Sequence, residues 1–288
     1  MGAVWWVVAG ALAFAPATAS AQISCGQYDF ARPYVSAFMA GETFADAGKA
    51  AETINTMSDG ACHQDRLLEL MKAHYGGVAG YKAAATSAGA QKQLGLDAPV
   101  LGVLFADMIL DDGATVAIDD GGRMIFELDL LARVGDPALA DATTREEALA
   151  ALDAFVPFIE LGDLMVPKGV TVTGPLLQAM NAGSRLGVKG TPMPTEGMTV
   201  DSLAEASGVL GMNGSVLTEA PAASLLGHPL DSVLWIAKAA KARGMALKAG
   251  DLLSLGSMGR FHLAAPGVIT GTYTGFGPED ASVTLTLQ

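Results

Sequence analysis

Three carboxylic acids near the middle of the chain have the types and spacing of a cation site. Glu127 and Asp129 alternate along an apolar stretch that predicts a β-strand, which places both side chains on one face. Glu160 follows where a helical pattern ends beside a second apolar run. Buried carboxylates this close repel one another and take up protons unless a cation lies among them. An all-oxygen set favours a hard divalent ion, Mg²⁺ or Mn²⁺, over zinc; acids on a solvated strand face are the alternative.

Strand patterns recur through the second part of the chain, and three helical patterns interrupt them. Strands are expected at 114–118, 124–134, 185–189, 198–203, 207–212, 215–220, 251–255 and 269–287, and helices at 88–94, 144–155 and 231–243. Asn213-Gly214, between two of the strands, is a hairpin signal. Long antiparallel strand runs with helices packed outside them predict an α+β fold.

Residues 22–78 are expected to form a helical N-terminal region, with helical patterns at 33–44, 49–57 and 63–74. Gly76, Gly77 and Gly80 end the helical signal. A second region, the strand-rich domain, is therefore expected from residue 79 to residue 288.

The composition permits a large core and excludes some partners. The chain has 288 residues, of which 51% are hydrophobic, enough for a core of one or two domains. The net charge of −13 disfavours nucleic acids and anionic membrane surfaces as partners. No phosphate-binding glycine loop, dinucleotide fingerprint or Ser-His-Asp arrangement stands out.

The first residues predict a secretory signal peptide. An apolar run of about a dozen residues precedes Pro16 and then Ala19-Ser20-Ala21, a small-residue cleavage pattern before Gln22. Cleavage after Ala21 would deliver the protein to the periplasm or to the medium. A membrane anchor is the alternative, but the run is shorter than the ~20 residues that a spanning helix needs, so no stable anchor is expected.

The chain contains two cysteines, Cys25 and Cys62, and both lie in the N-terminal region. In an oxidising compartment an isolated pair is most simply a disulfide. Two unrelated buried thiols are the alternative. No cysteine lies near a plausible base in the sequence, which argues against a thiol nucleophile.

Several short motifs occur in order along the second region. They are Gly-Tyr-Lys at 80–82 with Thr86, Gln-Lys-Gln-Leu-Gly at 91–95, Leu-Gly-Val-Leu-Phe-Ala-Asp-Met at 101–108, Glu-Leu-Asp-Leu-Leu at 127–131, Phe-Ile-Glu-Leu at 158–161, Gly-His-Pro-Leu-Asp-Ser-Val-Leu-Trp-Ile-Ala at 227–237 and Lys-Ala-Gly-Asp-Leu-Leu-Ser-Leu-Gly-Ser at 248–257. Together they resemble the 2-keto-4-pentenoate hydratases of the fumarylacetoacetate hydrolase superfamily, over residues 61–288.

The resemblance implies a fold and a metal site. The fold would be a rolled, mostly antiparallel β-sheet core like the C-terminal domain of fumarylacetoacetate hydrolase. Glu127, Asp129 and Glu160 match the family's metal ligands, and the metal, Mg²⁺ or Mn²⁺, would chelate a 2-oxo acid and stabilise its enolate. Lys82 matches the family's catalytic lysine, with a pKa expected to be lowered by the metal and an apolar wall. A surface lysine after a loop glycine is the alternative.

Three further residues are candidates for binding substrate. Gly256 and Ser257 resemble the small-residue turn that contacts substrate in the family, although a plain tight turn before a strand would have the same sequence. Asp107 ends an apolar run, where an acid often anchors a loop, and it is carried here as a substrate-binding candidate.

The resemblance implies a hydro-lyase that adds water to a 2-hydroxy-2,4-dienoate to give a 4-hydroxy-2-oxo acid. A 2-oxo acid decarboxylase and an acylpyruvate hydrolase would use the same metal–enolate chemistry. An exported, non-catalytic protein that binds an oxo acid or a metal is the other class. It is favoured by Val100 and Leu255, which stand where the family often has an acid and a hydroxyl residue. The expected partner is a small 2-oxo or 2-hydroxydienoic acid. The sequence does not decide whether the protein forms a homo-oligomer.

Overall fold

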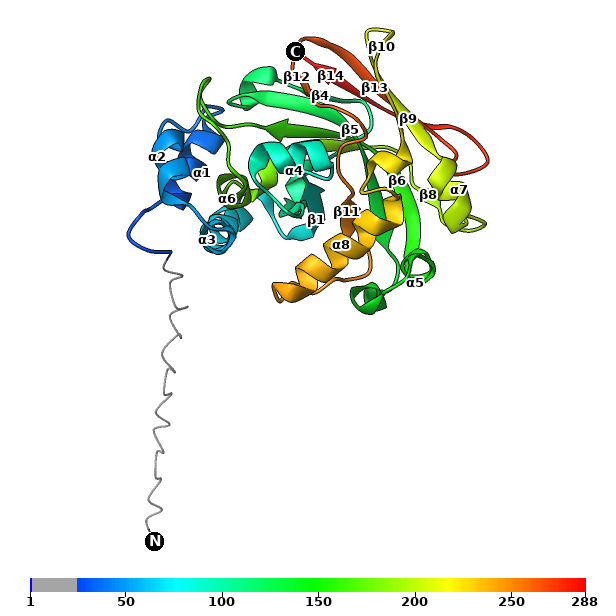
Figure 1. Ribbon diagram of the computed structural model, residues 1–288, viewed down its shortest axis with the longest axis horizontal. Helices are drawn as coiled ribbons and strands as arrows, with labels where there is room; N and C mark the ends of the chain where they lie inside the picture. The colour runs from blue at the N-terminus through cyan, green and yellow to red at the C-terminus, as the bar shows by residue number, and fades with distance from the viewer. Residues whose placement is uncertain (2–24) are drawn as a thin grey trace.

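A nine-stranded, curled sheet forms the centre of the molecule (Figure 1). The computed structural model describes Met1 and residues 25–288, so the predicted signal peptide lies outside the described residues except for Met1. The strand order is β2-β1-β11-β5-β6-β7-β3, with β12 paired to β5 and β8 paired to β6. The strands are β1 (Val78–Ala84), β2 (Val100–Phe105), β3 (Ile109–Asp111), β5 (Met124–Val134), β6 (Leu152–Asp163), β7 (Ser184–Lys189), β8 (Met193–Pro194), β11 (Leu252–Ser254) and β12 (His262–Leu263).

A second, five-stranded sheet lies beside the first in the order β10-β9-β13-β14-β4. Most strand pairs in both sheets are antiparallel; the parallel pairs are β1 with β11, β3 with β7, and β14 with β4. The mostly antiparallel α+β architecture predicted from the sequence is confirmed. The strands of the second sheet are β4 (Ala114–Val116), β9 (Ser207–Met212), β10 (Ser215–Pro221), β13 (Gly267–Thr274) and β14 (Ala281–Leu287).

Helices cover one end and one face of the main sheet (Figure 1). The N-terminal region is helical, as predicted, and consists of α1 (Ala31–Met39), α2 (Ala47–Thr53) and α3 (Met57–Tyr75). The later helices are α4 (Ala88–Leu94), α5 (Arg145–Ala150), α6 (Gly174–Ala179), α7 (Val200–Glu205) and α8 (Pro229–Ala242). Short 3-10 turns are η1 (Ala106–Met108), η2 (Ile118–Asp120), η3 (Pro137–Asp141), η4 (Asn181–Gly183) and η5 (Ala222–Ser224). None of the helices in the described part of the chain has the length and apolar character needed to cross a bilayer.

Helix α3 attaches the N-terminal helices to the rest of the molecule. A capping box between Thr56 and Asp59 starts the helix. Its buried positions include Gln64, Leu67 and Met71, spaced three and four residues apart, so one face packs inward. One continuous cluster of buried apolar residues includes members from α1 through to β14, and therefore the N-terminal helices and both sheets share a core.

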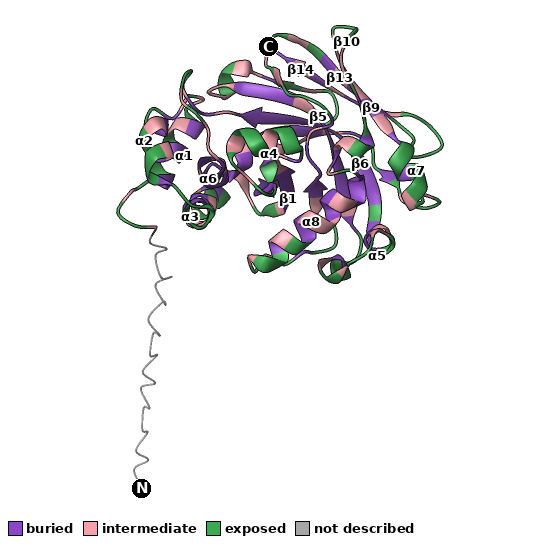
Figure 2. Ribbon diagram, viewed as in Figure 1, coloured by how far each residue is buried: buried purple, intermediate pink, exposed green. Residues whose placement is uncertain are grey.

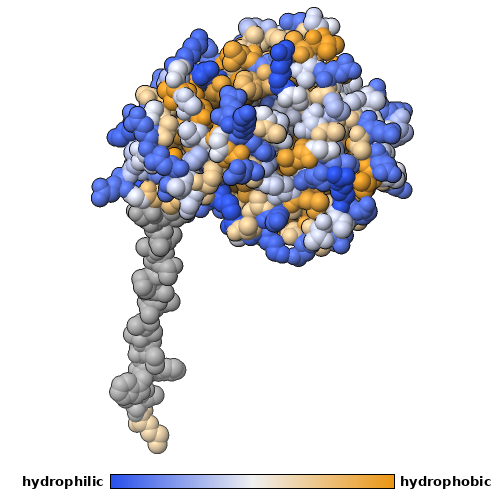
Figure 3. Space-filling model, viewed as in Figure 1, coloured by the Kyte–Doolittle hydropathy of each residue, from blue (hydrophilic) through white to orange (hydrophobic). Residues whose placement is uncertain are grey.

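The two longest strands, β5 and β6, are buried along most of their length (Figure 2). Strands covered on both faces need apolar side chains at odd and even positions alike. The surface, in contrast, mixes hydrophilic side chains with small apolar patches (Figure 3).

Three elements differ from the sequence-based expectation, and burial on both faces of a strand explains the first of them. The predicted helix at 144–155 ends at Ala150, and β6 begins at Leu152. The continuous apolar run lacks the alternation that identifies a half-buried strand, so it could not be distinguished from a helix. The predicted strand at 198–203 is helix α7, whose capping box joins Thr199 and Ser202. Strand β1 was missed because alanine, glycine and lysine dominate it, which are poor strand formers.

Other elements agree with the sequence. Strand β5 has the predicted bounds of 124–134, and helix α4 those of 88–94. The β9–β10 hairpin turns at Asn213 and Gly214, with φ of 51° and 79°. Two consecutive positive φ angles are what a type I′ hairpin turn requires.

The disulfide between Cys25 and Cys62 is present, with the two Cα atoms 5.6 Å apart, as predicted. Cys62 lies in helix α3, so the bond ties the start of the described chain to the helix that carries Gln64. The free energy of unfolding is expected to fall by about 4 kcal/mol when both cysteines are replaced by serine, because the bond closes a 37-residue loop in the unfolded chain. Denaturant titration measures this. Reductant should destabilise the wild type and leave the double variant unchanged; equal stability of the two proteins would contradict the prediction.

Candidate functional site

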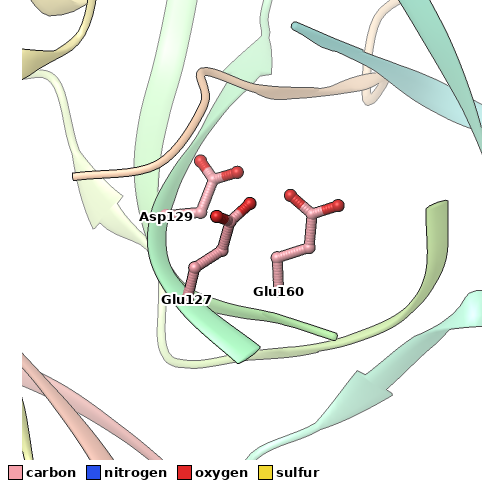
Figure 4. A group of neighbouring side chains, drawn as sticks. All are labelled: Glu127, Asp129 and Glu160. Carbon is pink, nitrogen blue, oxygen red and sulfur yellow. The ribbon is translucent and has the colours of Figure 1, made fainter. Parts of the chain in front are cut away.

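The three predicted metal ligands meet on one face of the main sheet (Figure 4). In the antiparallel β5–β6 pair, Glu127 lies directly opposite Glu160, and Asp129 lies opposite Phe158. Residues opposite each other project to the same face, as do alternate residues of one strand. One carboxylate oxygen from each of Glu127, Asp129 and Glu160 lies within 4.8 Å of the others. Glu160 therefore reaches the site from the middle of a strand, and the prediction that a helix end delivers it was wrong.

The electrostatics of this triad call for a cation. Burial, and then the charge of Glu160, raises the pKa of Glu127 to about 8, against a smaller opposing effect of Lys82. Burial and the charge of Glu160 also raise the pKa of Asp129 well above its usual value. Glu160 Oε2 is buried and has no hydrogen-bond partner among the described residues. Like charges opposite each other in a sheet are destabilising, so this donor set fits a hard divalent ion.

Lys82 lies on β1 and its ammonium group contacts the triad. It forms an ion pair with Glu160 Oε1 and lies 3.5 Å from the carbonyl oxygen of Ala182. The side chain is only 4% exposed, so the surface-lysine alternative does not hold. Burial alone lowers the pKa of Lys82, but Glu160, Glu127 and Asp129 together raise it, and the net direction is upward. In the metal-free protein the three carboxylates outweigh desolvation; the lowered pKa expected beside a bound metal stays a prediction.

The room for Lys82 comes from a glycine that the sequence interpretation overlooked. Gly102 on β2 lies opposite Lys82. A Cβ atom at position 102 would lie 2.6 Å from Lys82 Cγ and 3.0 Å from Ala182 Cβ. Any other residue here would displace the lysine. Gly102 is part of the 101–108 motif, but the sequence of one strand does not show which side chain of a neighbouring strand packs against it.

A strained turn supports the same lysine. Asn181 and Ala182 in η4 have φ of 53° and 55°, which are rare for residues other than glycine. The Asn181 side chain holds this turn to β2, accepting from Val103 N (2.8 Å) and donating to Val103 O (2.9 Å). Gln64 of helix α3 donates to Asn181 Oδ1 at 3.0 Å. The N-terminal helices thus support the active-site turn, a role that sequence reasoning did not predict.

Asp129 is held by donors from the last residue of β11 and from the segment that follows it. Ser254 Oγ donates to Asp129 Oδ2 at 2.6 Å, and Gly256 N donates to Asp129 Oδ1 at 3.1 Å. A Cβ at Gly256 would lie 2.5 Å from Thr86 Cγ2. Gly256 does not line the cavity described below; it orients Asp129, and the predicted contact with substrate is corrected to this positioning role. Ser254 is a further supporting residue that the sequence analysis missed.

A cavity of about 640 Å³ opens from the triad. Lys82, Glu127, Glu160 and Ser257 line its polar part. Ser257 Oγ is buried close enough to Glu127 to lower the pKa of that carboxyl group, but its geometry completes no hydrogen bond among the described residues, so the hydroxyl group can turn to a ligand. The apolar lining, called the apolar wall below, includes Ile125, Leu164, Val166, Val172, Leu177 and Met180. A second hollow of about 860 Å³, beside α5 and α7, contains none of the predicted site residues.

Asp107 does not belong to this cavity. It is exposed on the η1 turn, which follows the Phe105 end of β2, and its carboxylate lies near Gly76. Lys82 pairs with Gly102, near the middle of the same strand. The predicted substrate contact of Asp107 is therefore corrected: three residues of strand separate Gly102 from η1.

Metal-free protein is expected to lose stability as the pH rises from about 4.5 to about 8, the unfolded and folded pKa values of Glu127. The native state retains protons on Glu127 and Asp129 that the unfolded chain has already released, so stability falls with pH. The raised pKa of Lys82 acts above 10.5, outside this window. Denaturant unfolding in the presence of a chelator measures the slope. Glu127→Gln should flatten it, and stability that increases through this range would contradict the prediction.

The sequence of the chain is similar to those of two known hydratases. No protein-family model matches the chain. It is 31% identical over 220 residues to the TodF product hydratase of Pseudomonas putida, covering 76% of each protein. It is 30% identical over 192 residues to the 2-keto-4-pentenoate hydratase of Paraburkholderia xenovorans, covering 66% of this chain and 70% of that protein.

Among solved structures, the fold is similar to 4-oxalocrotonate decarboxylase from Pseudomonas putida complexed with magnesium and adipate. The TM-score is 0.78 at 23% identity, over 90% of this chain and 95% of that chain. The fold is also similar to that of fumarylpyruvate hydrolase from Pseudomonas aeruginosa, with a TM-score of 0.51 at 16% identity over 72% of this chain and 89% of that chain. With the sequence identity to the two hydratases, this shows that the chain belongs to the 2-keto-4-pentenoate hydratase family of hydro-lyases.

Proposed function

We propose that this protein is a divalent-metal-dependent hydratase that converts a 2-hydroxy-2,4-dienoate into a 4-hydroxy-2-oxo acid. The observation that carries the proposal is the buried triad of Glu127, Asp129 and Glu160, in contact with Lys82 at a cavity with an apolar wall. Membership in a family of hydratases supports the reaction class.

The triad would hold Mg²⁺ or Mn²⁺, as its buried carboxylates and the unpartnered Glu160 Oε2 suit a hard ion. Magnesium in the structurally similar decarboxylase supports this assignment. When bound, such an ion supplies Lewis-acid stabilisation to the oxygens of a 2-oxo acid.

The reaction needs two proton movements that this chain can direct. Ketonisation moves the proton of the 2-hydroxyl group to the carbon chain. Water then adds across the remaining double bond, with its hydroxyl on the fourth carbon and a proton on the third. Lys82 Nζ lies beside Glu160, where it can donate or accept these protons. Ser257 Oγ is free to donate to the substrate carboxylate, and the apolar wall shields the conjugated tail from bulk water.

A non-catalytic oxo-acid-binding protein is the second candidate, because two positions lack groups that could direct water. Val100 and Leu255 are both fully buried apolar residues, so neither supplies an acid or a hydroxyl. Decarboxylation or carbon–carbon hydrolysis would use the same triad and remains a variant of the first candidate.

An absorbance assay distinguishes these candidates. A 2-hydroxydienoate is incubated with the protein and Mg²⁺, its ultraviolet band is followed, and the product is identified by NMR. The proposal expects metal-dependent loss of the band and a 4-hydroxy-2-oxo acid. Chelator should stop the reaction, and Asp107→Asn, outside the cavity, should retain it. Loss of carbon dioxide would indicate the decarboxylase variant; metal-dependent binding without turnover would favour the non-catalytic protein.

We also propose that the protein is exported, with cleavage after Ala21. The disulfide between Cys25 and Cys62 supports this location, since such bonds persist in oxidising compartments. Intact-mass measurement of the protein from a secreting host should show a chain that begins at Gln22. A cytoplasmic product that keeps Met1 would overturn the proposal.

A further inference from the structure

The cavity contains positive charge far from the triad. Arg123 and Arg260 both line it. Neither forms an ion pair with a carboxylate of residues 25–288. Arg123 is half-buried, and its one side-chain hydrogen bond within this range goes to the carbonyl oxygen of Val166 at 3.0 Å. Arg260 is exposed beside Phe261. A guanidinium group has five N–H donors, so Arg123 retains donors for a ligand.

Asp163, which accepts a hydrogen bond from the backbone N–H of Arg123, forms no ion pair with the Arg123 side chain and is satisfied by other groups. Asp163 Oδ2 accepts from Gly122 N (2.8 Å) and from Arg185 Nε (2.7 Å). Its Oδ1 accepts from Met165 N (3.1 Å) and from the backbone N–H of Arg123 (2.7 Å). Asp163 therefore fixes the main chain at Arg123 and is itself paired with Arg185. Within residues 25–288, the guanidinium group of Arg123 therefore has no carboxylate partner.

The distance between Arg123 and the triad determines how long a ligand must be to reach both. Arg123, Ile125 and Glu127 alternate along the chain, and all three line the cavity. Strand pairing extends to Arg123, whose carbonyl oxygen accepts from Leu164 N at 3.2 Å. Arg123 and Glu127 are four positions apart in extended chain, so their Cα atoms lie about 13 Å apart.

Ile125 and Gly162 form the cavity lining between these two residues. Gly162 lies opposite Ile125 and also lines the cavity, and a Cβ there would lie 3.1 Å from Ile125 Cγ1. An extended six-carbon chain spans about 6 Å between its end carbons. With a polar contact of about 3 Å at each end, such a chain covers about 12 Å, which is close to the Cα separation of Arg123 and Glu127.

We propose that Arg123 binds a second carboxylate at the far end of the substrate. The substrate class is then a dicarboxylic 2-hydroxydienoate or 2-oxo acid of about six carbons, with its 2-oxo acid end at the triad. This inference rests on the proposed function for the near end. Arginine suits this role because its planar donors match a carboxylate in a bidentate contact. The carbon chain between the two ends would lie along Ile125 and the apolar wall.

Calorimetric titration of the full protein with Mg²⁺ present tests the proposal. The probes are 2-oxoadipate and 2-oxohexanoate, which have the same carbon chain but differ in a terminal carboxylate or methyl group. The wild type is expected to bind 2-oxoadipate at least about tenfold more tightly, the scale of one charge-assisted contact. Arg123→Met should abolish this preference, and Arg123→Lys should retain part of it. Arg133→Met, at the other end of β5 and outside the cavity, is the matched control and should retain it fully.

Oxalate separates this proposal from the proposed function. It reaches only the triad, so it should bind the wild type and Arg123→Met equally well with Mg²⁺ present. No oxalate binding to the wild type would refute the oxo-acid site itself. Oxalate binding together with equal affinity for the two six-carbon acids would overturn only the role of Arg123. Because the wild-type comparison needs no variant, the proposal stays testable even if Arg123→Met does not fold.

Discussion

Glu160→Gln is expected to lower kcat/KM by on the order of 10³-fold, the scale of several kcal/mol of lost Lewis-acid stabilisation. Glu160 is the central acid of the site: it faces Glu127 across the strand pair and contacts Lys82. A neutral amide removes one of three negative charges from the triad, so Mg²⁺ binding in the presence of oxalate should be lost as well. Steady-state kinetics and calorimetry measure the two effects.

Stability should respond far less than activity. Glu160→Gln removes the ion pair with Lys82 but also relieves repulsion with Glu127 and Asp129. The melting temperature of metal-free protein is therefore expected to stay within a few degrees of the wild type. Asp153→Asn is the matched control, because Asp153 lies on the same strand but is exposed. Full Mg²⁺-dependent oxalate binding by Glu160→Gln would show that the triad is not the metal site.

Lys82→Met is expected to lower kcat by about 100-fold or more, as for loss of a general acid–base group. Oxalate should still bind with Mg²⁺, since the three carboxylates remain. Stability should also change, because Lys82 is a buried strand residue and its ammonium group pairs with Glu160. Without its ammonium group, Glu127, Asp129 and Glu160 have no nearby counter-charge. Metal-free Lys82→Met should therefore melt below the wild type at pH 8, and Mg²⁺ with oxalate should restore most of the difference.

Lys72→Met on the exposed face of helix α3 is the control, with no expected change in rate or melting temperature. The comparison is a single-turnover dienoate assay with thermal melts in chelator and in Mg²⁺. Wild-type turnover by Lys82→Met would remove the lysine from the mechanism. Lower stability without a lower rate would assign it a structural role only.

Local sequence predicted the parts of the molecule that depend on near neighbours. Alternation along 124–134 is enough to place Glu127 and Asp129 on one strand face, because side chains of a strand alternate whatever it packs against. The Asn213-Gly214 turn is likewise decided by which residues tolerate positive φ. Two cysteines allow one intramolecular pairing, and that disulfide is present.

Burial on both faces concealed the rest of the triad. Along β6 the apolar residues occupy both odd and even positions, so nothing in 152–163 distinguishes a central strand from a buried helix. The same burial changes Lys82: its segment looks like a polar loop, but it pairs with β2 and β11 in the interior. Only the packed sheet brings three carboxylates to its ammonium group, and they raise its pKa in the metal-free protein.

The sequence by itself determined the chemical types at the site, the strand that carries two of the acids, and the family. Tertiary structure alone decided how the third acid arrives, why Gly102 must be a glycine, and how Gln64 and Asn181 support the turn behind Lys82. These features depend on register and contact between residues that lie from 20 (Lys82 and Gly102) to 117 (Gln64 and Asn181) positions apart along the chain. The sequence of a single strand or helix shows which of its side chains share a face. Which other segment packs against that face depends on the packing of the whole core.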